Sequence, residues 1–310
     1  MSNFVIFGVA GYIAIRHIKA IKELGHNLVA AYDKSDSVGV LDSFFHNVEF
    51  FTEFEVLDDY LKGLIESGVN IDYVVVCSPN YMHVFHSAYA LRLGANVICE
   101  KPLVLSSSEI TKLQELEYKN KGRLYSILQL RLHKEIEKLK RKYSHSKTLN
   151  KKNNVKLTYI TSRGPWYNVS WKNDEEKSGG ICSNIGVHFF DMLIYLFGAV
   201  ESVEVHVKEK DTCSGFIKLK NAEVDWFLST DQGYLPDKDK RTYRAIEING
   251  EEVEFSEGFT DLHKISYEQI LSGDGFGLSD NVPVTALIEN IRSSVVKGES
   301  IKFHDINDNL

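Results

Sequence analysis

Cysteine is scarce in this chain, and the four cysteines that occur are far apart. They are Cys77, Cys99, Cys182 and Cys213, and the sequence has no Cys-x-x-Cys pair. A disulfide framework or a structural zinc site needs cysteines at close and regular spacings. The spacing therefore predicts four small buried hydrophobic side chains and no metal site.

Long hydrophobic runs are also missing. The longest apolar runs, such as Tyr73 to Cys77, are far too short to cross a bilayer. Met1 to Phe7 lacks the basic start and the extended apolar stretch of a signal peptide. We therefore expect no membrane partner and a cytoplasmic location.

Positive charge is in deficit, with 36 Lys and Arg against 43 Asp and Glu and a net charge of −7. General nucleic-acid binding depends on clustered Lys and Arg that neutralise phosphates. The one basic run, Lys138 to Lys152, reads as a solvated helix end followed by a linker. The composition thus argues against a nucleic-acid partner.

The chain does have enough apolar residues for a large core. Its 310 residues are 43% apolar and 25% charged, which is typical of a globular protein of two domains. We place a dinucleotide-binding domain at residues 1–130. A domain for substrate binding and oligomerisation follows at 131–310, with a C-terminal helix expected to pack back on the first domain.

The first half alternates strands and helices in the manner of a doubly wound parallel sheet, that is, an α/β Rossmann domain. Ser106 to Ser108 offer N-caps to the fourth helix. The predicted strands are Phe4–Phe7, Leu28–Tyr32, Tyr73–Cys77, Val97–Cys99 and Leu124–Leu128. The predicted helices are Ile15–Leu24, Phe54–Ser67, His83–Leu93 and Ser108–Lys119.

The second half changes character and predicts an α+β domain with a large, mainly antiparallel sheet. A long helix from about Asn184 to Phe197 comes first, and a final helix from about Val284 to Val296 closes the chain. Asn249-Gly250 is a strong hairpin signal. The predicted strands are Val200–Val207, Phe216–Leu219, Val224–Ser229, Tyr243–Ile248 and Glu251–Phe255.

A glycine-containing loop, Gly8-Val9-Ala10-Gly11-Tyr12-Ile13-Ala14, follows the first predicted strand directly. Glycine lets the chain double back, and the next helix then presents its N-terminal amides to a pyrophosphate. The spacing is Gly-x-x-Gly-x-x-Ala, so the loop alone is a weak signal. Asp33 lies 22 residues after Gly11, where a carboxylate accepts hydrogen bonds from a ribose and repels a 2′-phosphate. The glycine loop and Asp33 together favour NAD over NADP.

Two residues are suited to moving a proton. Lys101 follows a predicted strand and precedes Pro102, where desolvation would lower the pKa of its amine. His188 lies on the predicted helix behind Gly179-Gly180, and Asn184, His188 and Asp191 fall at i, i+4 and i+7. Either Lys101 or His188 could be the base that takes the proton of an alcohol while a hydride leaves.

Four segments together resemble one family. They are Gly11-x-Ile13-Ala14-x-Arg16-His17, Cys77-Ser78-Pro79-Asn80-x-x-His83, Glu100-Lys101-Pro102 and Gly179-Gly180 to Asp191. The chain is similar over nearly its whole length to the Gfo/Idh/MocA oxidoreductases. The resemblance implies an NAD-dependent sugar dehydrogenase. It also implies cofactor contacts from Gly8, Gly11, Tyr12, Ile13, Asp33, Ser78, Pro79, Asn80, His83, Glu100 and Lys101.

A narrower resemblance concerns the substrate. Asp36-Ser37-Val38-Gly39, Gln129 to His133 and Arg163 to Lys172 look like those of bacterial UDP-N-acetylglucosaminuronate 3-dehydrogenases. That group oxidises the sugar C3 hydroxyl on the route to 2,3-diamino-uronic acids of surface polysaccharide such as O-antigen. The implied substrate contacts are Lys101, Arg131, Arg163, Tyr167, Trp171, Lys172, Asn184 and His188.

The resemblance further implies a homotetramer and 2-oxoglutarate as a co-substrate that recycles the cofactor. The wider family commonly has aspartate at the position of Asn184, and the amide here removes that negative charge. Two alternatives stay open. One is a family dehydrogenase of a free sugar or inositol, and the other is a non-catalytic regulator that senses dinucleotide.

Overall fold

The computed structural model describes residues 1–144, 152–253 and 261–297. So far as they are described, the residues divide into two compact units. The first is Met1–Leu132 with Thr260–Val282, and the second is His133–Phe259 with Pro283–Leu310. The chain therefore leaves the first unit and later returns to it.

The first unit contains a six-stranded parallel sheet in the order β3-β2-β1-β4-β5-β6. This is the order of a dinucleotide-binding sheet, with its switch point between β1 and β4. The strands are β1 (Asn3–Phe7), β2 (Asn27–Tyr32), β3 (Glu49–Phe51), β4 (Tyr73–Val76), β5 (Asn96–Cys99) and β6 (Leu124–Ser126). The predicted Rossmann fold is confirmed, although β3 was not predicted. Its three residues are too few to show a period of two.

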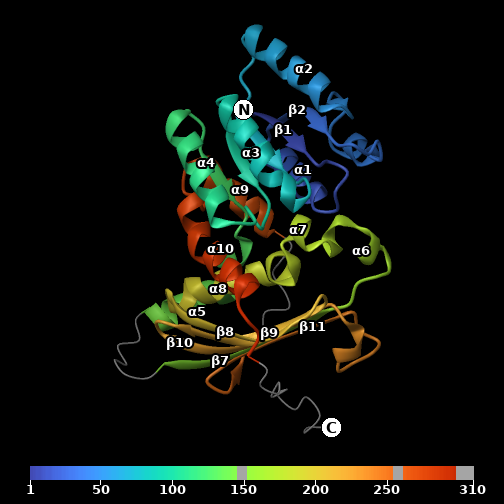
Figure 1. Cartoon of the computed structure of the whole chain (residues 1–310). Helices are drawn as coiled ribbons and strands as arrows, with labels where there is room; N and C mark the ends of the chain where they lie inside the picture. The colour runs from blue at the N-terminus through green and yellow to red at the C-terminus, as the bar shows by residue number, and fades with distance from the viewer. Residues whose placement is uncertain (145–151, 254–260, 298–310) are drawn as a thin grey trace. The chain divides into compact units, whose positions relative to one another are not determined.

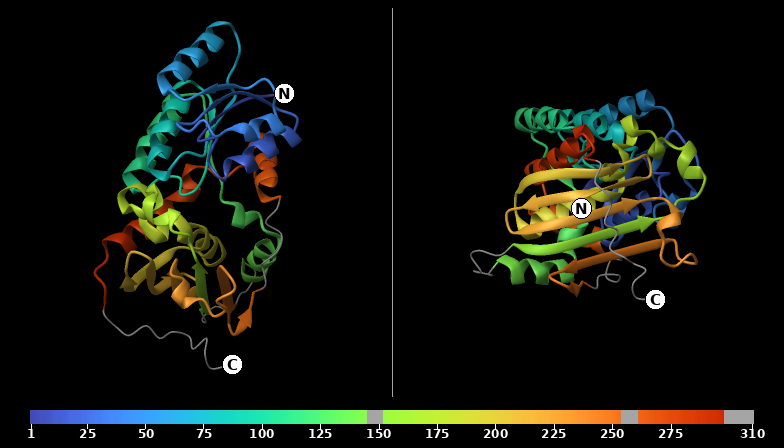
Figure 2. Two further views of the ribbon diagram at one scale, coloured as in Figure 1. Left: turned by 90° about the vertical axis from the view of Figure 1, so that its right-hand side faces the viewer. Right: turned by 60° about the horizontal axis from the view of Figure 1, so that its bottom comes forward.

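Helices cover both faces of this sheet (Figure 2, left view). Side chains of α2 (Phe54–Glu66), α3 (His83–Arg92) and α4 (Ser107–Lys119) share one apolar cluster with the strands. Side chains of α1 (Ala14–Glu23) and α9 (Leu262–Ser272) share a second cluster on the other face. α9 belongs to the returning segment and was not predicted.

The second unit contains a six-stranded sheet in the order β12-β11-β7-β10-β9-β8. Its strands are β7 (Asn153–Thr161), β8 (Val200–Lys208), β9 (Thr212–Leu219), β10 (Ala222–Ser229), β11 (Thr242–Ile248) and β12 (Glu251–Glu252). β7 pairs parallel with β10, and the other described pairs are antiparallel. The sheet is therefore mixed, and its parallel pair involves β7, a central strand that was not predicted.

The Asn249-Gly250 turn joins β11 to β12 as expected. Both residues have positive φ, 55° and 86°, which is the backbone of a two-residue hairpin. The predicted strand Glu251–Phe255 ends at Glu252, and its residues after Val253 lie outside the described part of the chain.

Helices α5 (Lys134–Ser144) and α8 (Val187–Phe197) lie on one face of this sheet (Figure 1), and the right view of Figure 2 looks onto its other face. The linker predicted after α5 falls mainly on residues 145–151, outside the described part. The last helix, α10 (Leu278–Ser293), begins six residues before the predicted start and contains Pro283.

The long predicted helix from Asn184 begins with a π-helical turn, η5 (Cys182–Gly186), before α8. At Gly186 a Cβ would lie 2.7 Å from Leu228 Cδ1, so a larger residue here would require the side chain of Leu228 on β10 to shift. Asn184 and His188 are half-buried, whereas Asp191 is only 2% exposed. The predicted face shared by all three residues is therefore accessible only at Asn184 and His188.

Among the described residues, one helical stretch, Glu175–Phe197, has the length and apolar composition that a membrane span would need. Its most apolar 18 residues are 72% buried inside the protein, as in a core helix.

Candidate functional site

The loop after β1 is tightly folded around Gly8. Its φ is +84°, and its N–H donates to the carbonyl of Tyr32 at 2.8 Å. A Cβ at this position would lie 2.5 Å from the backbone of Cys77 and Ser78. Glycine is required here on both counts. The loop continues through Gly11 and the 88% exposed Tyr12 to the N-terminus of α1, which has no side-chain cap.

Asp33 stands at the end of β2, beside this loop. Its Oδ2 accepts the backbone N–H of Ala10 at 3.0 Å, and its Oδ1 accepts that of Ser35 at 2.9 Å. An uncapped helix N-terminus and an acidic residue at the second strand are the features that hold a pyrophosphate and a ribose. The residues present therefore fit a dinucleotide.

The loop after β4 supplies Ser78, Pro79 and Asn80, with Ser78 and Asn80 buried. His83 follows and is 1% exposed. Its Nε2 lies 2.8 Å from the Ser78 carbonyl and its Nδ1 lies 2.7 Å from the Pro102 carbonyl. His83 thus joins the loop after β4 to the loop after β5. Burial lowers the pKa of its imidazole, although the two carbonyls act in the opposite direction.

Glu100, Lys101 and Pro102 follow β5, and the peptide bond between Lys101 and Pro102 is cis. Glu100 is 5% exposed, and its Oε1 lies 3.0 Å from Nε2 of both His17 and His263. Burial acts to raise the pKa of the Glu100 carboxyl, but the hydrogen bonds of the two histidines outweigh it and hold that pKa well below 4.5. Lys101 is half-buried.

Among the described residues, His17, Glu100 and His263 are also the group whose donor atoms, all within 4.8 Å of one another, come near the spacing of a metal site. Hydrogen bonds already account for these contacts. The remaining nitrogen of His17, Nδ1, lies 2.9 Å from the Tyr267 hydroxyl.

Arg131 has a partner within the first unit. Its Nη1 donates to Asp280 Oδ1 at 2.7 Å, and its guanidinium lies 4.9 Å from the centroid of the Phe276 ring. The side chain is 8% exposed. Arg131, which was predicted to contact the substrate, therefore forms an ion pair with Asp280.

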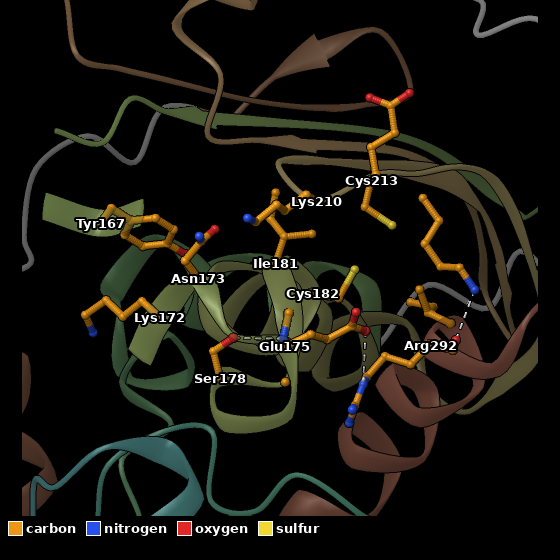
Figure 3. Close-up of a pocket in the computed structure, with 15 residues that line it drawn as sticks. Tyr167, Lys172, Asn173, Glu175, Ser178, Ile181, Cys182, Lys210, Cys213 and Arg292 are labelled. Carbon is orange, nitrogen blue, oxygen red and sulfur yellow. Dashed lines mark hydrogen bonds and ion pairs between the residues drawn. The ribbon is translucent and has the colours of Figure 1, made fainter. Parts of the chain in front are cut away.

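The second unit contains a cavity of about 360 Å³ (Figure 3). Two predicted substrate residues, Tyr167 and Lys172, line it. The others in the lining were not predicted, and they include four chemically notable side chains: Ser178, Lys208, Lys210 and Arg292. Cations outnumber the two carboxylates, Glu175 and Glu209, in this lining. Because of these cations the cavity favours an anionic ligand, although the net charge of the whole protein is negative.

Three other predicted substrate residues, Asn184, Arg163 and Trp171, contact or lie near Tyr167 and Lys172. Asn184 donates from Nδ2 to the Tyr167 hydroxyl at 2.8 Å, and burial raises the pKa of that hydroxyl. The Arg163 guanidinium lies 6.0 Å from the centroid of the Tyr167 ring, and the Lys172 ammonium lies 4.2 Å from that of Trp171. His188 lies on α8, one turn beyond Asn184.

Sequence reasoning missed two kinds of residue. Lys208, Lys210 and Arg292 reach the cavity from β8, the turn after it and α10, and nothing local in the sequence marks them. His263 reaches Glu100 from 163 residues away. Predicting a helix over Leu262–Ser272 was the one way in which the sequence could have pointed to His263.

Comparison with known sequences agrees with this geometry. The profile described as "Oxidoreductase family, NAD-binding Rossmann fold" matches residues 2–127. The companion profile "Oxidoreductase family, C-terminal alpha/beta domain" matches residues 151–306. The first unit is thus an NAD-binding domain.

Among solved structures, the WlbA (WbpB) dehydrogenase of Thermus thermophilus is 46% identical. The complex with NAD and alpha-ketoglutarate has a TM-score of 0.93 and covers 97% of this chain and 98% of that chain. The complex with NAD and UDP-GlcNAcA has a TM-score of 0.92 and covers 97% of each.

A curated relative, a putative UDP-kanosamine synthase oxidoreductase subunit of Amycolatopsis mediterranei, is 31% identical over 136 residues. This match covers 44% of the chain and 37% of the relative, so the chain spans well under half the length of that protein. Both family profiles together cover most of the sequence. The chain belongs to the Gfo/Idh/MocA family of oxidoreductases.

Proposed function

We propose that this protein oxidises the C3 hydroxyl of UDP-N-acetylglucosaminuronic acid to the 3-keto sugar nucleotide with NAD. The observation that carries the proposal is the 46% identity, over 97% of the chain, to a dehydrogenase solved with NAD and UDP-GlcNAcA. The cation-rich cavity of the second unit supports it, because the substrate carries a carboxylate and a diphosphate.

In the proposed reaction, Lys101 takes the proton of the C3 hydroxyl in its neutral amine form. NAD, once bound, supplies the acceptor for the hydride that leaves C3. His188 positions the hydroxyl or shares its proton, and Asn184 keeps the Tyr167 hydroxyl in place through their hydrogen bond. Arg163, Lys172 and Trp171 contact the sugar nucleotide.

The cofactor contacts in this proposal come from the segments already described after β1, β2, β4 and β5. Gly8, Gly11, Tyr12 and Ile13 bind the pyrophosphate, and Asp33 binds the adenosine ribose. The part of the cofactor site beside Lys101 is formed by Ser78, Pro79, Asn80, His83 and Glu100. Since the Glu100 and His83 side chains are occupied by protein partners, we expect their contribution to be support and not direct contact.

Several finer points belong to the same proposal. We expect 2-oxoglutarate to accept the hydride from the reduced cofactor, and a homotetramer as the working assembly. We also expect a cytoplasmic enzyme that serves surface-polysaccharide synthesis. The four cysteines are free and buried, which agrees with a reducing compartment.

The test is product mass. Protein incubated with NAD and UDP-N-acetylglucosaminuronate, with and without 2-oxoglutarate, should form a sugar nucleotide lighter by two hydrogens. UDP-N-acetylglucosamine, which lacks the carboxylate, is the matched control and should react poorly, because it offers no carboxylate to the cationic side chains of the site. Oxidation of a free sugar or inositol in place of the uronate would contradict the proposal. Dinucleotide binding with no oxidation of any of these would favour a sensor.

A further inference from the structure

Glu100 precedes the proposed catalytic lysine and lies in a buried cluster with His17 and His263. Both of its carboxylate oxygens are engaged. Oε1 receives Nε2 of each histidine at 3.0 Å, and Oε2 accepts the backbone N–H of Lys101 at 3.1 Å. We propose that Glu100, held by His17 and His263, is a positioning residue that fixes Lys101 for proton transfer.

The three residues come from distant parts of the first unit. Glu100 follows β5, His17 is on α1 and His263 is on α9. Their separations along the chain are 83 and 163 residues. Because α1 begins at the nucleotide-binding loop, the cluster ties that loop's helix to the segment that carries Lys101. It also gives the returning helix α9 a role at the site.

The other side of Lys101 is held as well. His83 contacts the carbonyl of Pro102 at 2.7 Å. Lys101 therefore lies between two neighbours, each fixed by buried histidine contacts, with His17, His83 and His263 at most 4% exposed. Such support restricts the backbone from which the lysine side chain reaches its substrate.

Hydrogen bonding within the cluster is self-consistent. A neutral His17 that donates from Nε2 to Glu100 can accept the Tyr267 hydroxyl at Nδ1, 2.9 Å away. The carboxylate then accepts three hydrogen bonds. Glutamine could accept hydrogen bonds only at its carbonyl oxygen. In Glu100→Gln the side-chain NH2 group would therefore face an N–H donor of a neighbouring residue and form no hydrogen bond with it.

This inference rests on the proposed function, in which Lys101 is the base. A base displaced by about 1 Å can cost about 10²-fold in rate. Glu100→Gln should therefore lower kcat by about 10²-fold while KM for the sugar nucleotide and Kd for NAD change by less than about threefold. A side chain that merely stabilised the fold would not separate kcat from these two constants.

His263 offers a rescue test. Glutamine can place an N–H donor near the position of Nε2, whereas leucine cannot. His263→Gln should keep kcat within about threefold of the wild type, and His263→Leu should lower it by about tenfold or more. Tyr89→Phe is the matched control, because it removes another hydrogen bond of the same unit, from Tyr89 to Asp58 at 2.8 Å, and should leave kcat unchanged.

The variants are compared on whichever alcohol the wild type oxidises. If the wild type does not oxidise the uronate, the proposed substrate is wrong, but the positioning role of Glu100 is still tested on the alcohol that reacts. Three results would overturn the positioning role. The first is wild-type kcat in Glu100→Gln. The second is equal damage from both His263 variants at equal stability. The third is one equivalent of protein-bound zinc that Glu100→Gln loses.

Discussion

The carboxylate of Asp33 accepts the backbone N–H of Ala10 at 3.0 Å, so the residue predicted to bind the ribose also holds the nucleotide-binding loop. A carboxylate oxygen can accept more than one hydrogen bond. Asp33 can therefore keep this contact and bind a ribose hydroxyl at the same time. Its charge also disfavours a 2′-phosphate.

Replacing Asp33 should consequently change both affinity and selectivity. We expect Asp33→Ser to weaken NAD binding by about tenfold, from loss of a charge-assisted hydrogen bond, and to reduce discrimination against NADP. Isothermal titration with both dinucleotides measures the two effects. Asp36→Ser, three residues on and exposed, is the control. Unchanged selectivity in the Asp33 variant would show that this carboxylate does not face the ribose.

Lys101 and His188 should differ in how much turnover depends on them. Loss of a general base typically costs about 10²-fold to 10⁴-fold. We predict that Lys101→Met lowers kcat into that range while NAD still binds, because the loop around Gly8 is untouched. His188→Asn should be the milder change. If His188→Asn proves the more damaging of the two at equal NAD affinity, the roles are reversed.

His86 should make stability depend on pH. Burial lowers the pKa of this imidazole from 6.5 to about 3, and the side chain is 2% exposed. Below pH 6.5 the unfolded chain binds a proton that the folded chain does not. The free energy of unfolding should thus fall as the pH drops, by up to about 1.4 kcal/mol per pH unit from this group.

A phenylalanine at this position tests the effect. His86 stacks on Phe54 at 5.6 Å, so His86→Phe preserves the ring packing and loses the 2.8 Å contact with the Ser78 hydroxyl. Urea unfolding between about pH 5 and pH 7 should show a shallower loss of stability in the variant. His17 and His83, whose pKa values burial also lowers, should leave a residual slope. Parallel pH curves for variant and wild type would refute the assignment.

Arg163 is predicted to recognise the substrate carboxylate. Arg163→Ala should lower kcat/KM for the uronate by about tenfold to 10²-fold and change that for UDP-N-acetylglucosamine little, because a lost charged hydrogen bond costs about 1.5–3 kcal/mol. Arg241→Ala, which removes another exposed arginine of the second unit, is the control. Equal losses on both sugar nucleotides would assign Arg163 to a part that the two share.

The fold of the first unit could be predicted from sequence because its order is local. Apart from β3 and α9, the strands and helices there carry their own periodicity, and Ser106, which the sequence offered as an N-cap, forms a capping box with Glu109. The centre of the second sheet was harder. β7 alternates polar and apolar residues weakly, and its parallel partner β10 is 69 residues away in register. Pairing at that distance leaves no local signal.

The site shows the same division. The loop at Gly8, Asp33 and the Glu100–Pro102 segment could be found from spacing, since each follows a strand of the parallel sheet. The engagement of Arg131 by Asp280 could not, because 149 residues separate them. His263 and Arg292 were missed for the same reason. Contacts between distant segments decide which charged groups face a ligand and which serve the protein's own structure.

An isotope label shows which hydroxyl of the sugar is oxidised. The substrate is UDP-N-acetylglucosaminuronate with deuterium at C3, incubated with the protein and NAD. Oxidation at C3 predicts that deuterium leaves the sugar and appears on the nicotinamide ring, or in 2-hydroxyglutarate when 2-oxoglutarate is present, while substrate deuterated at C4 transfers no label to either. Turnover in which the C3 deuterium stays on the sugar would show that another position is oxidised.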